Sequence, residues 1–266
     1  MKSKLWLRFD YSPTISYLVN TFIYELDIQK ANISILYWKK VIDKKTYDYL
    51  YNAERMVRQV YIGKLQRDSK VANILKDGII EAKRVLFEAN NIEDYEVLSI
   101  KNDAVYIIGR LPQNLEFGLI KFIPKNTYTG FYKLTNLELY YYYNGMIQEE
   151  KLDVKGIGDS NLCKHELYFY KFLKDLFFTL QTKPLKVSID ILKQFYMQYI
   201  TLSLPIEFYR PFNVTSEYKL NIATNIVHTG FILDSINDNM KPLLDISVNL
   251  NHLVNLQKIL MDIYFK

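Results

Sequence analysis

Apolar and polar residues follow two different repeats along the chain, and the most informative stretch is residues 95–108. Two short runs rich in β-branched and aromatic residues flank the polar triplet Lys101-Asn102-Asp103 there. This pattern predicts a β-hairpin with the triplet at its tip. An earlier segment predicts a strand that ends at Asp27 and runs into the apolar start of a helix. Two acidic side chains that one sheet brings together can hold divalent metal ions.

The rest of the chain alternates between helical and β patterns. Residues 39–94 have helical periodicity, with Asp43 as the cap of a first helix. Residues 115–157 alternate as strands of an antiparallel sheet, and residues 161–266 return to helical periodicity. The finer predictions are helices over residues 14–22, 44–63, 69–90, 161–180, 187–202 and 247–264, and turns at Ser12-Pro13, Asn126 and Asn144-Gly145.

Composition indicates a protein that is folded throughout its 266 residues, with 49% apolar residues and only 9 Gly and 7 Pro. No apolar run reaches the roughly 20 residues that span a bilayer, and the N-terminus lacks a long apolar core. We therefore expect a cytoplasmic protein with no membrane partner. The single Cys163 excludes an internal disulfide and a cysteine-based zinc site. The net charge of +5 permits nucleic-acid binding without requiring it.

Polar positions around the predicted strand ends resemble those of family B DNA polymerases. The segment that starts at Asp27 is similar to their motif A, D-x-x-S-L-Y-P-S-I, in register. The matching positions are Asp27, Ala31, Asn32, Ser34 and Ile35. Residues 101–106, Lys-Asn-Asp-Ala-Val-Tyr, resemble motif C, D-T-D-S-V-F, with Lys101 in place of the first Asp.

Two downstream segments extend the resemblance. Lys125-Asn-Thr-Tyr128 resembles the K-K-x-Y element, and residues 151–157 resemble the K-L-x-x-K-G-L strand that follows it in the family's palm. Each match is weak alone, but the four occur in the right order at plausible spacings. Together they cover roughly residues 20 to 160.

The resemblance implies an α+β fold arranged as a right-hand polymerase. Its palm, an antiparallel sheet with helices, would comprise residues 1–38 and 95–160. Residues 39–94 would form short helical fingers and a palm helix, and residues 161–266 a helical thumb. The family's N-terminal domain and 3′–5′ exonuclease have no counterpart. Three explanations stay open: one half of a split enzyme whose other half is a separate chain, a minimal polymerase, or a decayed polymerase that binds other replication or transcription subunits. The chain is compact, and its Lys- and Tyr-rich composition is typical of an AT-rich genome. These features suggest a viral origin and hence a host-cytoplasm location.

The same resemblance implies template-directed nucleotidyl transfer on primer–template DNA. Asp27 and Asp103 would be the catalytic carboxylates, and they would hold two Mg²⁺ or Mn²⁺ ions about 3.5–4 Å apart. The residues predicted to meet the incoming nucleotide are Asn32, Arg55, Arg58 and Lys64. The residues predicted to contact nucleic acid are Lys101, Lys125, Tyr128 and Lys155.

Departures from the family leave a second interpretation open. Lys101 replaces an acid, and Asn32 stands where the family has the Tyr that excludes ribonucleotides. Asp48 and Arg55 occupy the positions of the Lys and Tyr of the family's fingers motif. The cations of that helix can equally form a solvated surface. A catalytically inactive structural subunit, derived from a polymerase, is therefore the alternative function.

Other chemistries have little support. His165, His228 and His252 lack the spacing of metal ligands, and no glycine-rich phosphate loop is present. Reverse transcriptases share the palm, but their Y-x-D-D tip matches residues 100–103, Ile-Lys-Asn-Asp, less well. The sequence thus predicts a nucleic-acid-binding, polymerase-like protein.

Overall fold

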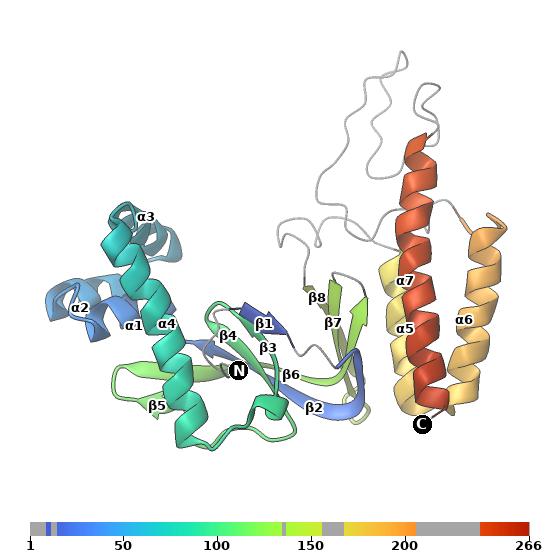
Figure 1. The fold of residues 1–266 in the computed structure, drawn as a ribbon, viewed down its shortest axis with the longest axis horizontal. Coiled ribbons are helices and arrows are strands. Elements are labelled where there is room, and N and C mark those ends of the chain that lie inside the picture. Colours follow the sequence, from blue (N-terminus) through green and yellow to red (C-terminus); the bar gives the residue numbers. More distant parts are fainter. Residues whose placement is uncertain (1–8, 12–14, 135–136, 156–167, 206–239, 266) are drawn as a thin grey trace, which may run out of the picture. The chain divides into compact units, whose positions relative to one another are not determined.

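The structure is a computed structural model that describes residues 9–11, 15–134, 137–155, 168–205 and 240–265 (Figure 1). The predicted α+β class is confirmed, because helices accompany antiparallel strands. The chain forms two compact units, described separately below. Unit 1 comprises Met1–Ile15 and Thr21–Tyr128, and unit 2 comprises Ser16–Asn20 and Thr129–Lys266. The assignment of palm, fingers and thumb boundaries stays a prediction.

Unit 1 is organised around a sheet with the strand order β1-β3-β4-β2-β6. The β1–β3, β3–β4 and β4–β2 pairs are antiparallel, and the short β5 also pairs antiparallel with β6. The predicted hairpin of residues 97–108 is confirmed as β3 and β4. The strand bounds are Phe9–Tyr11 (β1), Tyr17–Ile28 (β2), Val97–Lys101 (β3), Ala104–Ile108 (β4), Glu116–Phe117 (β5) and Ile120–Leu134 (β6).

One face of this sheet packs against helices. Leu26 and Ile28 of β2 share a buried apolar core with side chains of α1 and α4. Gly78 of α4 allows the two helices to approach closely, because a Cβ there would lie 2.3 Å from Cγ2 of Ile35. The bounds are Ala31–Trp38 (α1), Lys44–Asn52 (α2), Arg55–Leu65 (α3) and Ser69–Ala89 (α4), with a 3-10 turn at Asp94–Glu96. Because side chains alternate along a strand, Glu25 and Asp27 point to the opposite face.

Unit 2 combines the second part of β6 with β7, β8 and three helices. The β6–β7 and β7–β8 pairs are antiparallel. Tyr132 of β6 stacks on Phe177 of α5, with ring centroids 3.9 Å apart and planes 3° from parallel. Helices α5, α6 and α7 run side by side (Figure 1). The bounds are Leu137–Asn144 (β7), Glu149–Lys155 (β8), Tyr168–Thr182 (α5), Leu185–Ile200 (α6) and Met240–Tyr264 (α7).

Three local predictions are wrong. The helix expected over residues 14–22 is wrong in its described part, because residues 17–22 form the start of β2, whose Val, Thr, Phe and Ile side chains suit a strand. The expected helix over residues 44–63 is two helices, α2 and α3, because Ala53 is extended (φ −71°, ψ 158°). The expected turn at Asn126 is absent, since β6 continues through it.

Other local predictions are confirmed. The Asp43 side chain caps α2 by accepting a hydrogen bond from the Thr46 N–H at 2.8 Å. The helices predicted over residues 69–90 and 187–202 correspond to α4 and α6. The Ser12-Pro13 turn and the first residues of the helix predicted from 161 lie outside the described residues. Among the helices that the structure describes, none is both long and apolar enough to cross a membrane.

Candidate active site

The site lies where β2 ends beside the tip of the β3–β4 hairpin. Asp27 is the penultimate residue of β2, and its Cα is paired with that of Ala104, the residue after Asp103. The hairpin turn consists of Asn102 and Asp103, and Asn102 adopts the left-handed conformation with φ 54°. Asn tolerates this conformation better than most residues. The sequence prediction that these strands bring Asp27 and Asp103 together therefore agrees with the strand pairing.

The two carboxylates interact strongly enough to change the chemistry of Asp27. Burial and the neighbouring Asp103 carboxylate, with a smaller contribution from Glu25, raise the pKa of Asp27 from 3.8 to about 6. The Lys125 ammonium acts in the opposite direction. Oδ1 of Asp27 is buried and has no hydrogen-bond partner in the part of the chain that the structure describes. A pair of carboxylates in this state attracts cations, because each negative charge disfavours the other.

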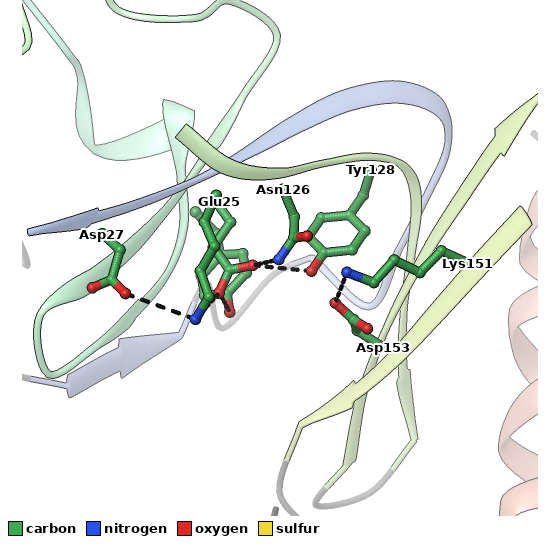
Figure 2. Close-up of polar contacts among 8 residues, drawn as sticks. Glu25, Asp27, Asn126, Tyr128, Lys151 and Asp153 are labelled. Atoms are coloured by element: carbon green, nitrogen blue, oxygen red, sulfur yellow. Dashed lines mark hydrogen bonds and ion pairs between the residues drawn. The ribbon is translucent and has the colours of Figure 1, made fainter. Parts of the chain in front are cut away.

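Glu25 lies beneath this pair and was missed in the sequence. Its side chain is buried, only 2% exposed, on the same face of β2 as Asp27. Tyr106 donates a hydrogen bond to Oε1 at 2.9 Å, and Asn126 and Tyr128 donate to Oε2 at 2.5 and 3.0 Å. Figure 2 shows the Asn126 and Tyr128 side chains converging on Glu25. The available signal was an acid two residues before Asp27, between Tyr24 and Leu26 of the strand.

Lys125 supplies a positive charge beside the two acidic side chains of β2. Its Nζ lies 3.7 Å from Oδ2 of Asp27 and 3.9 Å from Oε1 of Glu25. The Lys125 side chain is 53% exposed, so its ammonium group also faces solvent. The sequence predicted Lys125 as a nucleic-acid contact, and its exposed position at the carboxylate pair is compatible with that role.

A buried lysine forms a hydrogen bond with the backbone of the hairpin tip. Lys83 of α4 is completely buried, and its Nζ donates a hydrogen bond of 2.8 Å to the backbone carbonyl of Asn102. This bond ties the residue next to Asp103 to the long helix of unit 1. The Asn102 carbonyl thereby accepts a hydrogen bond from a charged donor, and such a bond is stronger than one from a neutral donor.

Two cations gather near the start of α1, which follows Asp27 closely. Lys30 precedes α1 in the left-handed conformation (φ 47°), and its Nζ donates to the carbonyl of Tyr51 and lies over the Tyr51 ring. Burial and the nearby Arg58 lower the pKa of Lys30. Arg58 donates to the carbonyl of Ala53 at 2.7 Å. Asn32 lies in the first turn of α1 and is partly exposed.

The predicted fingers cations do not share one face of α3. Arg55 and Lys64 are both exposed, but they are nine residues apart, which places them on opposite sides of a helix. Arg58 instead faces the α2–α3 connection through its bond to Ala53. Of the four residues predicted to bind nucleotide, Asn32 lies in α1 itself and Arg58 lies near Lys30, which precedes α1.

The remaining predicted contacts occupy different environments. Lys101 is partly buried, with Nζ 5.7 Å from the centre of the Tyr106 ring. Tyr128 is completely buried with its hydroxyl on Glu25, so a direct contact with a primer would require it to leave this position. Lys155 lies in β8 of unit 2, where Glu138 is its backbone neighbour in the antiparallel strand β7. Their roles in binding nucleic acid stay predictions.

The donor set suits a hard divalent cation. Mg²⁺ is typically held by one or two carboxylates together with substrate phosphates and water. Asp27 and Asp103 are such carboxylates, and Oδ1 of Asp27, which has no partner in the described part of the chain, is an acceptor that a cation could use. Within the described ranges, no group of three or more His, Cys, Asp and Glu side chains could form a metal site by itself. These residues therefore fit a cation that is shared with a substrate.

Comparison with known proteins gives the family. Residues 1–262 match the family described as bacteriophage PBS1 gene 130 protein. A search of curated proteins found no match to the chain. The family match covers nearly the whole chain, so the predicted viral origin is confirmed. The chain belongs to the bacteriophage PBS1 gene 130 protein family.

Proposed function

We propose that unit 1 carries the catalytic centre of a family B-like polymerase, which extends a primer by two-metal nucleotidyl transfer. The observation that carries this proposal is the meeting of the Asp27 and Asp103 carboxylates at the end of β2 and the tip of the β3–β4 hairpin. The chain order supports it, because α1 to α4 stand between the two acidic strands and the β6–β8 strands follow. The resemblance in the sequence has the same order.

The residues of the site suit the roles that this chemistry needs. Asp27 and Asp103 would hold Mg²⁺ or Mn²⁺, which when bound neutralises phosphate charge and activates the primer 3′ hydroxyl. Lys125 presents its half-exposed ammonium beside Asp27, where it can neutralise a phosphate of the primer strand. Lys83 keeps the Asp103 turn in place through the Asn102 carbonyl.

A triphosphate has a suitable position at the start of α1. The N-terminal end of a helix favours anions, because its first backbone N–H groups lack partners within the helix. Lys30 and Arg58 add two positive charges near this end, and Lys30 is an addition that the sequence prediction did not include. In this proposal Asn32 would contact the sugar of the incoming nucleotide. Arg55 and Lys64 remain candidates for longer-range attraction of the triphosphate.

The second candidate is a catalytically inactive subunit that retains the polymerase fold. It is favoured by the position of Lys125, whose ammonium already serves as an internal counter-charge for Asp27. Lys101, which replaces an acid of motif C, adds another positive charge to the hairpin tip. In this case the protein would bind duplex DNA within a replication or transcription complex, and another chain would supply the chemistry.

Primer extension distinguishes the two candidates. The full chain is incubated with a labelled DNA primer–template, Mg²⁺ or Mn²⁺, and either deoxyribonucleotides or ribonucleotides, with Asp27→Asn and Asp103→Asn beside it. Asp77→Asn, an exposed carboxylate of α4, is the matched control. Extension that is lost in the first two variants and kept in the control supports catalysis. Absence of extension, together with duplex binding that weakens as salt rises, supports the inactive subunit.

A partner chain belongs to the same proposal. The proofreading exonuclease of the family would be supplied by a separate protein, or the chain would work within a larger replication or transcription assembly. If so, extension by the isolated chain is expected to be distributive and to tolerate mismatched primer ends. Rapid removal of a mismatched 3′ end by the purified chain would contradict this part of the proposal.

A further inference from the structure

Glu25 is an unusually costly residue to place in a sheet. A buried carboxylate must recover the hydration that it loses, and Glu25 does so through three neutral donors from two neighbouring strands. Tyr106 comes from β4, and Asn126 and Tyr128 come from β6. The three bonds fix the carboxylate, so its negative charge has a definite position next to Asp27.

The position of Lys125 reflects two competing attractions. Its Nζ is 3.7 Å from Asp27 and 3.9 Å from Glu25, and both distances exceed those of a hydrogen bond. A flexible, half-exposed lysine beside a single carboxylate would be free to approach it to about 2.7–2.9 Å, the usual length of a charge-assisted hydrogen bond. The nearly equal distances indicate that the ammonium is shared between two fixed negative charges.

Sharing leaves Asp27 available. Among the residues that the structure describes, the buried Oδ1 of Asp27 has no hydrogen-bond partner, and the contact with the lysine is made by Oδ2. If Lys125 paired fully with Asp27, the charge that attracts a divalent cation would be neutralised. The fixed charge of Glu25 opposes that pairing because it attracts the same ammonium from the other side.

We propose that Glu25 is a positioning residue for the carboxylate pair: anchored by Tyr106, Asn126 and Tyr128, it holds the Lys125 ammonium away from full pairing with Asp27 and so keeps Asp27 open to a divalent cation. This inference rests on the proposed function, because it concerns the same metal site. Glu25 itself touches neither substrate nor metal in this scheme.

A double-mutant cycle tests the contact without requiring activity or metal. Unfolding by urea is measured for the full chain and for Glu25→Gln, Lys125→Met and the double variant. Glutamine keeps the shape of the side chain and one acceptor oxygen but removes the charge. If the two groups interact, the effects are non-additive, and the folding equilibrium constant shows a coupling of about threefold or more. Strictly multiplicative effects would overturn the inference, because Glu25 would then not hold Lys125.

A second cycle tests the positioning role by Mn²⁺ affinity, measured from the electron paramagnetic resonance signal of free Mn²⁺. Glu25→Gln should weaken Mn²⁺ binding about fivefold or more in the wild-type background and less than about twofold beside Lys125→Met. The part that persists in the Lys125→Met background is the direct loss of a negative charge. The surplus in the wild-type background is the effect of releasing Lys125 onto Asp27.

Tyr106→Phe is the matched control, since it removes one hydrogen bond to Glu25 and keeps every charge. It should change stability but leave Mn²⁺ affinity within about twofold. If Glu25→Gln behaves like this control, Glu25 is merely structural and the inference fails while the metal site stands. If the wild-type protein binds no Mn²⁺ through Asp27, the proposed function fails, and the positioning role fails with it.

Discussion

Replacing Asp27 by Asn should stabilise the metal-free protein at neutral pH. Asp27 has a pKa of about 6 in the folded chain, against 3.8 for an ordinary Asp, chiefly because of burial and the Asp103 carboxylate. The folded chain therefore binds this proton more tightly than the unfolded chain does. As the pH falls below about 6, the folded chain takes up this proton and gains stability. As the pH rises back to about 6, it releases the proton and loses that stability.

The structure sets the magnitude. The rise in the pKa of Asp27 from 3.8 to about 6 corresponds to roughly 3 kcal/mol of destabilisation above pH 6, since each pKa unit is worth about 1.4 kcal/mol. The Asp27 side chain is only 25% exposed, so solvent screening removes a minor part of this amount. The variant also loses the attraction of Lys125, which reduces the gain. We expect Asp27→Asn to raise the free energy of unfolding by about 1–3 kcal/mol at pH 7.5.

The assay is urea unfolding between pH 4 and pH 8 in a chelating buffer, with Asp77→Asn as the surface control. The difference between Asp27→Asn and wild type should grow from pH 4 to about pH 6 and then stay constant. Saturating Mg²⁺ should stabilise wild type and leave the variant unchanged, because a ligand stabilises only the state that binds it. Parallel pH profiles for the two proteins, or a variant less stable at pH 7.5, would refute the reasoning.

Three further substitutions test the packing of the two units. Gly78→Ala should destabilise unit 1 by about 1–3 kcal/mol, because the new Cβ would meet Ile35 at 2.3 Å; an unchanged urea midpoint would contradict this packing. Gly63→Ala, the same change in the exposed last turn of α3 with no atom within 4 Å of the new Cβ, should instead stabilise by up to about 1 kcal/mol, and thermal unfolding checks the opposite sign. Tyr132→Phe should be neutral or stabilising by about 1 kcal/mol, because it removes a buried hydroxyl that has no partner among the described residues and keeps the stack on Phe177; a clear loss of stability would show that the hydroxyl is bonded.

Local patterns predicted the elements that local physics decides. The hairpin of β3 and β4 follows from two β-branched runs around a polar triplet, and α4 follows from a long amphipathic repeat. The break between α2 and α3 could not be predicted, because no Gly or Pro marks it and Arg58 satisfies the Ala53 carbonyl from a turn later. The continuation of β6 through Asn126 depends on Glu25, about a hundred residues earlier in the chain.

The same distinction applies to the site. Asp27 and Asp103 were predicted from strand ends and a family resemblance, and the strand register places them together. Glu25 and Lys83 were not predicted, because an acid and a lysine in apolar segments usually belong to a solvated edge. Their roles depend on partners that only the fold supplies, namely two tyrosine hydroxyls, an amide and the carbonyl of a tight turn.

The pairing of Glu25 with Tyr106 has a consequence for evolution. The two residues are direct neighbours across β2 and β4, in the register that also sets Asp27 opposite Ala104. A slip of one residue would turn Glu25 towards the apolar core, so this bond selects the correct alignment during folding. Selection on folding would preserve Glu25 and Tyr106 even in descendants that had lost their chemistry. If the proposed polymerase activity holds, relatives that keep this pair but vary at Asp27 and Asp103 would mark the lineages that lost it.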